Sequence, residues 1–195
     1  NVMVSLYPKG GFQMMGGSRP GRVADDGTFT VKNVGPQTMS VTVTGLPAGY
    51  YVKAANYGQQ DAKANGLTAA GSNDLVDIVV SPNGANVDGV VHNHAGDPVA
   101  GAIVVLAPPP VERSDTRRFR TARTDQAGHF NLKGVEPNDY TVFAWEDIEA
   151  GEYMDPDVLK AAENHGKALK LKESSQESLD VESIPAEETP AAAGF

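Results

Sequence analysis

The feature that most restricts the fold is an internal repeat, in which the same order of short segments occurs twice along the chain. Each copy contains an apolar segment, a turn, an alternating segment and a proline, in the same order. Matches that keep one register indicate tandem copies of a single domain. Four pairs of segments match: 2–8 with 102–108, 22–36 with 123–137, 39–52 with 140–153, and 75–82 with 178–185.

The repeat divides the 195 residues into domains. We predict a first domain at 1–82, a second at 83–185 and a C-terminal tail at 186–195. Charge agrees with this division, because 1–82 carries six Lys/Arg and five Asp, whereas 83–195 carries ten Lys/Arg and twenty Asp/Glu. The two parts therefore differ in net charge, +1 against −10.

The local pattern in both copies is that of short β-strands. The stretches GTFTVKNV (27–34) and GHFNLKGV (128–135) alternate apolar and polar residues with the period of a strand. Asp and Gly around their starts favour tight turns. Several short strands separated by turns predict an all-β protein with one β-sandwich in each half.

One short helix is expected in the second domain, within MDPDVLKAAENHGKAL (154–169). Asp155 is suited to the N-cap and Pro156 to the first helical position. Gly166 is suited to the C-terminal stop.

The second copy also carries a specific series of motifs. They are a Gly-x-Val strand, a Gly-x-Pro-Val-x-Gly-Ala turn, a Thr-Asp-x-x-Gly-x-Phe segment and a Gly-Val-x-Pro-x-x-Tyr return. Through them it resembles the carboxypeptidase regulatory-like family, which implies transthyretin-like or Ig-like β-sandwiches without a catalytic role. The motif residues are Gly89, Val91, Gly96, Pro98, Val99, Gly101, Ala102, Thr124, Asp125, Gly128, Phe130, Gly134, Val135, Pro137 and Tyr140. The first copy keeps Asp26, Gly27, Phe29, Val34 and Pro36.

The first copy has no counterpart of the strand and turn at 86–101. A sandwich without one strand exposes an apolar groove and unpaired backbone groups, at about 1–3 kcal/mol for each buried group left unsatisfied. Three explanations are open. The strand lies upstream in a longer precursor, a smaller sheet tolerates the loss, or another chain donates the strand.

Strand donation between copies would be head-to-tail and would propagate into a fibre. The expected interface residues are Val2, Val4 and Leu6 on the accepting side and the tail from Ala191 to Phe195 on the donating side. The tail has weak β propensity and contains proline, which counts against it as a donor.

Composition and motifs exclude several classes of function. The net charge of −9 disfavours a nucleic-acid partner. No apolar run approaches the roughly 18 residues of a membrane span, and the chain has no Cys for disulfides or thiolate metal sites. It also lacks a zinc-peptidase pair, a nucleophile elbow and a phosphate-binding loop. We therefore predict no enzymatic activity and no cofactor.

The acidic segment EDIEAGEYMDPD (146–157) offers carboxylates for calcium, which binds several converging oxygens. Its candidate ligands are Glu146, Asp147, Glu149 and Glu152. Because their spacing follows no known calcium loop, a solvated acidic loop is the preferred interpretation.

Two polar features also have structural interpretations. His92 and His94 would share one strand face and reach a common metal, but a third ligand is missing. The segment RSDTRRFRTAR (113–123) is interpreted as a solvated strand edge, with a contact to the acidic face of another subunit as the alternative.

Aromatic residues offer a platform for a sugar ring. Tyr50, Tyr51 and Trp145 are the candidates, although packing inside the sandwiches is the simpler expectation. Adjacent tyrosines in a strand point to opposite faces.

These observations predict a non-catalytic, secreted or cell-surface structural protein of a bacterium. In this hypothesis it assembles with copies of itself into a filament or surface layer. The alternative is a carbohydrate-binding or adhesive module of a larger surface protein.

Overall fold

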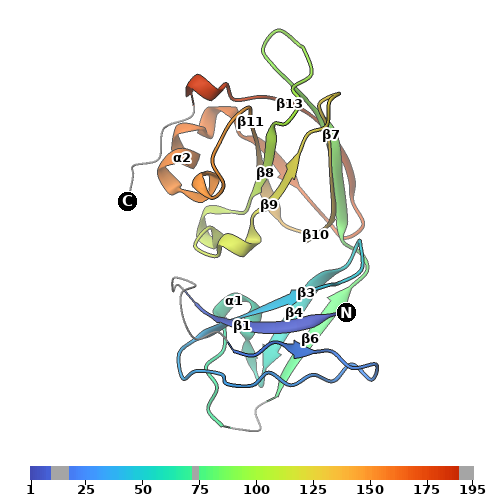
Figure 1. The fold of residues 1–195 in the computed structure, drawn as a ribbon, viewed down its shortest axis with the longest axis vertical. Coiled ribbons are helices and arrows are strands. Elements are labelled where there is room, and N and C mark those ends of the chain that lie inside the picture. The colour runs from blue at the N-terminus through green and yellow to red at the C-terminus, as the bar shows by residue number, and fades with distance from the viewer. Residues whose placement is uncertain (10–17, 72–74, 189–195) are drawn as a thin grey trace. The chain divides into compact units, whose positions relative to one another are not determined.

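The computed structural model describes residues 1–9, 18–71 and 75–188. It divides the chain into two compact units, Asn1–Pro82 (unit 1) and Asn83–Phe195 (unit 2). Both units consist mainly of β-strands with a few short helices, which confirms the all-β prediction (Figure 1). No helix among the described residues has the length and apolar character needed to cross a membrane.

Unit 2 is a sandwich of two sheets with strand orders β10-β7-β13 and β12-β11-β8-β9. The neighbours in these sheets run antiparallel, except that β13 runs parallel to β7. The strands are β7 Ala85–His92, β8 Ile103–Ala107, β9 Arg120–Arg123, β10 His129–Val135, β11 Asp139–Trp145, β12 Lys167–Lys170 and β13 Gln176–Glu182.

The core of unit 2 lies between its two sheets. Alternate side chains of each strand point into it, so Val87 and Val91 on β7 meet Val104 on β8 and Val142 on β11, and all four are fully buried. Burial of apolar side chains at this density is the main favourable term in folding, about 25 cal/mol for each Å² removed from water.

A second core covers the outer face of the sheet β12-β11-β8-β9. The helix α2 (Pro156–Ala161) lies beside this sheet (Figure 1). Its buried Val158 and Leu159 pack in one cluster with Phe143 and Trp145. Five short 3-10 helices complete the described elements: η1 Pro110–Glu112, η2 Thr116–Arg118, η3 Glu152–Met154, η4 Glu163–His165 and η5 Ala186–Glu188.

The helix α2 begins as predicted and ends earlier than predicted. The Asp155 carboxylate caps it by accepting a hydrogen bond from the Asp157 N–H at 2.7 Å, and Pro156 is its first residue. It ends at Ala161, and Gly166 has φ −71° rather than the left-handed backbone of a helix stop. Gly166 is needed for space instead, because a Cβ there would lie 2.6 Å from Thr141 Cγ2 and 2.9 Å from Phe143 Cε1.

Unit 1 has two three-stranded sheets, with orders β2-β1-β3 and β5-β4-β6. Its described core is small, with Leu6, Met39, Ala55, Ala62 and Leu67 as its buried members. The elements are β1 Met3–Pro8, β2 Gly21–Arg22, β3 Met39–Thr44, β4 Tyr51–Tyr57, β5 Gln60–Asp61, α1 Ala62–Asn65 and β6 Val76–Ser81.

One sheet of unit 1 repeats a sheet of unit 2. β1 lies between β2 and β3 as β8 lies between β9 and β11, with all pairs antiparallel. Even the bridge of Met39 to Leu67 corresponds to the pairing of Tyr140 with Leu169 on β12. The two units differ in their other sheet, where unit 2 has β7 at the centre and the described residues of unit 1 form no equivalent strand.

Candidate functional site

The alternating segment at 28–34 of unit 1 does not form the strand that its sequence predicts. Its counterpart in unit 2, β10, pairs with β7 over its length, whereas 28–34 forms a single isolated bridge, from Lys32 to Arg19. The strand prediction was wrong here because a strand needs a hydrogen-bonded neighbour. The described part of unit 1 supplies no strand in the position of β7.

The backbone of this segment nevertheless keeps the conformation of its counterpart. Gly27 and Gly128 have φ of 85° and 75°, and Asn33 and Gly134 have φ of 60° and 66°. In unit 2 the left-handed residue Gly134 lies at the bulge in the β10–β7 ladder, between Leu132 and Val135. The segment therefore shares two left-handed residues with its counterpart in unit 2.

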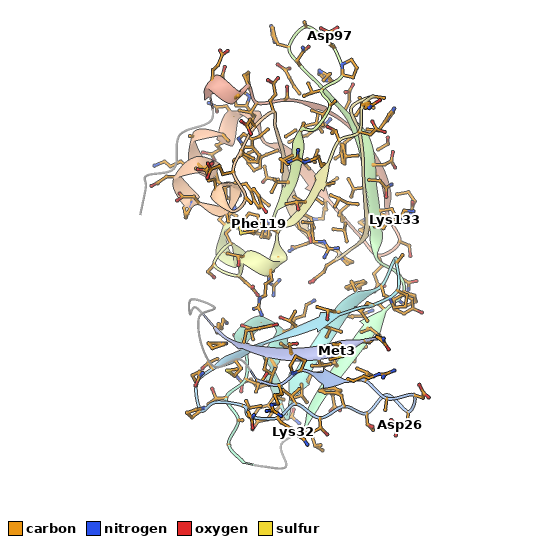
Figure 2. The ribbon with its side chains drawn as sticks, viewed as in Figure 1. Met3, Asp26, Lys32, Asp97, Phe119 and Lys133 are labelled. Atoms are coloured by element: carbon orange, nitrogen blue, oxygen red, sulfur yellow. The ribbon has the colours of Figure 1, made fainter. Side chains whose placement is uncertain are left out.

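Asp26 lies in the turn just before this segment (Figure 2). The backbone of the turn is hydrogen-bonded in the same way in both units, from the Ala24 N–H to the Thr28 carbonyl and from the Asp125 N–H to the His129 carbonyl, each at 2.8 Å. The carboxylates are not equivalent, because Asp26 stands in the position of Ala127 and Asp125 in that of Ala24. The Asp26 carboxylate accepts hydrogen bonds from the Thr28 hydroxyl and N–H, at 2.7 and 2.9 Å. These bonds lower the pKa of Asp26. The Asp125 carboxylate accepts from the His129 N–H and the Ala127 N–H, both at 2.9 Å, which lowers the pKa of Asp125.

The apolar side chains of 28–34 are only half-buried. Phe29, Val31 and Val34 are partly exposed to solvent. Their counterparts on β10, which are Phe130, Leu132 and Val135, are buried in the core of unit 2. Unit 1 therefore has corresponding apolar side chains, and among its described residues no strand covers them.

In the repeat, strand β6 corresponds to β13, which pairs with β7 in unit 2. β6 pairs with β4 and lies at the end of the order β5-β4-β6, so its second edge has no strand neighbour among the described residues. Leu75 just before it and Val79 and Val80 within it are exposed by 80%, 48% and 40%. β6 therefore presents an apolar edge.

The corresponding strand of unit 2, β13, carries polar residues at these positions. Ser178, Glu182 and Ser183 stand where the first copy has Leu75, Val79 and Val80. Charged residues on an edge strand discourage pairing with other chains, and β6 lacks that protection except for Asp77. We call the segment 28–34 and β6 together the acceptor site.

Sequence reasoning missed β6 and assigned the interface to the first strand instead. Val4 and Leu6 are buried and Val2 is half-buried, and β1 is paired on both edges by β2 and β3. The interface role of these residues stays a prediction. The contrast of apolar β6 with polar β13 is the sequence signal that would have located the site. The predicted donor residues Ala191 and Phe195 lie outside the described residues.

The candidate calcium ligands do not converge. The Glu146 carboxylate accepts a hydrogen bond from the Ser183 hydroxyl at 2.8 Å, and that of Glu152 accepts from the Glu149 N–H at 3.1 Å. Asp147 is exposed. Within the described ranges, no group of three or more His, Cys, Asp or Glu is arranged to hold a metal ion.

The aromatic candidates do not form a sugar-binding platform. Trp145 is fully buried and stacks on Phe143 with ring centroids 5.2 Å apart. Tyr51 is buried and Tyr50 is 37% exposed. Trp145 therefore has no free face, because α2 and Ile184 cover the sheet around it.

The histidines and arginines have local partners. His92 Nε2 lies 3.0 Å from Asp180 Oδ1, and His94 Nδ1 lies 3.1 Å from Glu182 Oε1, so each histidine pairs β7 or its turn with β13. In the basic segment, Arg117 pairs with Asp115 at 2.7 Å. The other local contacts are Arg118 with Glu112 at 2.9 Å and Arg113 with the Pro108 carbonyl at 3.0 Å.

No protein-family model matches the chain, so membership in the carboxypeptidase regulatory-like family stays a prediction. No curated protein matches it either. Solved structures show distant similarity to β-sandwich domains of Gram-positive surface proteins and pilins.

The TIE protein of Bacillus anthracis is 14% identical with a TM-score of 0.33, covering 93% of this chain and 30% of that chain. The pilus 2b backbone protein of group B streptococcus is 13% identical with a TM-score of 0.35, covering 95% and 79%. GBS52, the minor pilin of Streptococcus agalactiae, is 12% identical with a TM-score of 0.30, covering 100% and 86%. The chain thus spans under a third of the TIE protein, and 34% of the matched major pilin of Bacillus cereus.

Proposed function

We propose that this protein is a non-catalytic structural subunit of a bacterial surface assembly of the pilus-like kind. Copies join when an extended segment of one copy adds a strand to the acceptor site of the next. The single observation that carries this proposal is the exposure of Val79 and Val80 on β6, a strand that pairs with β4 and has no neighbour on its other edge among the described residues.

Strand addition supplies the acceptor site with hydrogen-bond partners and with cover for its apolar side chains. An added strand gives hydrogen-bond partners to the backbone of β6 and of 28–34, and its side chains cover Phe29, Val31 and Ile78. Such a contact joins two different surfaces of the subunit. It is therefore heterologous and extends into a filament rather than closing as a dimer.

The carbohydrate-binding alternative has less support. Its central residue, Trp145, is buried in the second core of unit 2. Exposed apolar residues lie instead on β6, and an apolar strand edge favours a peptide strand over a sugar as its ligand.

The test is the oligomeric state of the chain by sedimentation velocity over a wide concentration range. We expect concentration-dependent oligomers that Val79→Lys strongly reduces, because a lysine on an edge strand opposes strand addition. The matched control is Val111→Lys, which replaces a valine that is 89% exposed in unit 2. Circular dichroism verifies that both variants are folded.

A chain that stays monomeric at every concentration would overturn the proposal. Equal loss of oligomers in Val79→Lys and Val111→Lys would also overturn it, since the effect would then be general surface hydrophobicity. Oligomers that persist unchanged in the Val79→Lys variant would place assembly elsewhere.

A further inference from the structure

We propose that the peptide bond between Asp97 and Pro98 is a self-cleavage site, at which the Asp97 carboxylate breaks its own peptide bond by acyl transfer to water. The bond lies on the loop between β7 and β8, and Figure 2 labels Asp97 there. This inference is independent of assembly through β6, because it concerns a loop of unit 2 alone.

The sequence contains two Asp–Pro bonds, 97–98 and 155–156. In such a bond the side-chain carboxylate reaches the carbonyl carbon of its own residue by rotation about one side-chain bond. Proline has no backbone N–H, so the competing attack of the following amide nitrogen on the side chain does not occur. The structure around each carboxylate therefore decides which of the two bonds reacts.

Asn93 holds the backbone of Asp97 in place. The Asp97 N–H donates a hydrogen bond to Asn93 Oδ1, and the Asn93 N–H donates one to the Asp97 carbonyl oxygen, both at 2.9 Å. The second bond puts a donor on the oxygen that gains negative charge when the carbonyl carbon is attacked. The Gly96 N–H closes the same turn on the Asn93 carbonyl at 2.9 Å.

The Asp97 side chain, by contrast, is free to rotate. Asp97 is exposed, and its carboxylate has no hydrogen-bond or ion-pair partner among the described residues. The histidines nearby contact carboxylates of β13 instead, since His94 lies 3.1 Å from Glu182 and His92 lies 3.0 Å from Asp180. Exposed side chains change rotamer within nanoseconds, so the Asp97 carboxylate repeatedly approaches its own carbonyl carbon.

Asp155 provides the comparison within the same chain. Its carboxylate accepts a hydrogen bond from the Asp157 N–H at 2.7 Å and caps α2. Its carbonyl accepts from the Leu159 N–H at 3.0 Å, so the carbonyls of both Asp–Pro bonds are hydrogen-bonded. The difference lies in the carboxylates, because attack by Asp155 would first have to break the cap of α2.

The cleavage step balances with water as the only co-reactant. One carboxylate oxygen of Asp97 forms a bond to the carbonyl carbon of the same residue, and the bond from that carbon to the Pro98 nitrogen breaks. The nitrogen takes a proton from solvent and becomes a free N-terminal amine. Water then opens the cyclic anhydride left on Asp97 and gives two carboxyl groups.

The cleaved protein should keep the fold of unit 2. The piece 1–97 ends after β7, which lies between β10 and β13 of the other piece. Val87 and Val91 on β7 are fully buried in the core. We therefore expect the two pieces to elute together in native gel filtration and to separate in urea.

The test compares the two Asp–Pro bonds of the full chain. The chain is incubated for several weeks at about pH 4, where carboxylates and a ready supply of protons are both present, and fragments are identified by mass spectrometry. We expect the pieces 1–97 and 98–195 to form about tenfold or more faster than 1–155 and 156–195, because only Asp97 has a free carboxylate. Circular dichroism verifies that the chain is folded in this buffer.

Unfolding the chain is the matched control for the role of the fold. In urea at the same pH the cap on Asp155 is lost, so we expect the two bonds to break at similar rates. Equal rates of the two cleavages in the folded chain would overturn the inference. So would the absence of the piece 98–195 after several weeks.

Substitutions and a trapping reagent test the role of the carboxylate. Asp97→Ala should abolish cleavage at 97–98, and Asp97→Glu should slow it about tenfold because the carboxylate is displaced by one methylene. Methoxyamine in the buffer should capture the anhydride and leave a methoxyamide on the piece 1–97. Cleavage of the Asp97→Ala chain at an unchanged rate, or cleavage without any methoxyamide, would show direct attack by water and overturn the proposal.

Discussion

Asn33 and Gly134 occupy equivalent positions in the two units, and both have a left-handed backbone, with φ of 60° and 66°. In unit 2 this conformation belongs to a bulge in a complete ladder, between Leu132 and Val135. In unit 1 it persists in a segment with a single bridge. The bend is therefore a local property of the segment, and the neighbouring strand is not needed to produce it.

Substitutions at Asn33 test this local origin. Asn33→Val should destabilise unit 1 by about 1–2 kcal/mol, because a β-branched side chain is strained at positive φ. Asn33→Gly should be neutral or stabilising. Hydrogen exchange of the β1 amides measures the effect, with Lys32→Val as the control at an exposed neighbour with ordinary backbone. Equal protection in Asn33→Val and Lys32→Val would show that the left-handed bend is absent.

Gly89 lies on β7, opposite Phe130 on β10 and Leu179 on β13. Gly89→Ala should lower the free energy of unfolding of unit 2 by about 1–3 kcal/mol, since the new Cβ meets Phe130 and the Leu179 carbonyl. Urea unfolding followed by Trp145 fluorescence measures it, because Trp145 is the only tryptophan in the sequence. Val90→Thr, on the outer face of the same strand, is the control and should change stability little. A neutral Gly89→Ala would contradict the steric argument.

Tyr140 is expected to make unit 2 less stable as the pH rises into the alkaline range. Its hydroxyl donates a hydrogen bond to the Glu136 carbonyl at 3.1 Å, and burial raises its pKa. Near neutral pH, Tyr140→Phe should cost about 1 kcal/mol through the lost hydrogen bond. Above about pH 10 the unfolded chain ionises this tyrosine while the folded chain does not, so the unchanged protein loses stability as pH rises.

The difference in free energy of unfolding between the unchanged protein and Tyr140→Phe should therefore shrink above about pH 10, where ionisation of the unfolded tyrosine begins. Urea unfolding of both proteins at a series of pH values measures it. A constant difference across that range would show that Tyr140 ionises equally in the folded and unfolded chains.

Trp145 should behave as a buried core residue. Its emission is expected at short wavelength, with iodide quenching far weaker than in the unfolded chain, because none of its surface is exposed. Trp145→Ala should destabilise unit 2 by about 3–5 kcal/mol. Trp145 emission that shifts on addition of an oligosaccharide would contradict the buried position and would support the hypothesis of a sugar platform.

Much of the local structure follows from the sequence, as α2 illustrates. Asp155 caps the helix because its carboxylate reaches an N–H two residues away, and Pro156 fits the first turn. The end of the helix was mispredicted for a tertiary reason. Gly166 serves the close approach of Phe143 on β11, which no local pattern shows.

The interface residues predicted on the first strand lie in a strand that is paired on both edges. The repeat indicated that the first copy lacks a strand, but Val4 and Leu6, expected at the gap, lie inside a complete sheet. In the repeat, β6 corresponds to β13, which pairs in unit 2 with β7, a strand distant from it in sequence. A strand's neighbours are set by contacts across the sandwich and not by adjacency along the chain.

By itself, the sequence determined the period of the strands, the turns at Asp26 and Asp125, and the duplication, because each depends on residues close together in the chain. The tertiary structure decided which strands pair, that Trp145 is covered, and that β6 carries the open apolar edge. The physical reason is that backbone hydrogen bonds in a sheet join segments far apart in sequence. Whether an alternating segment becomes a strand depends on the neighbour that it meets.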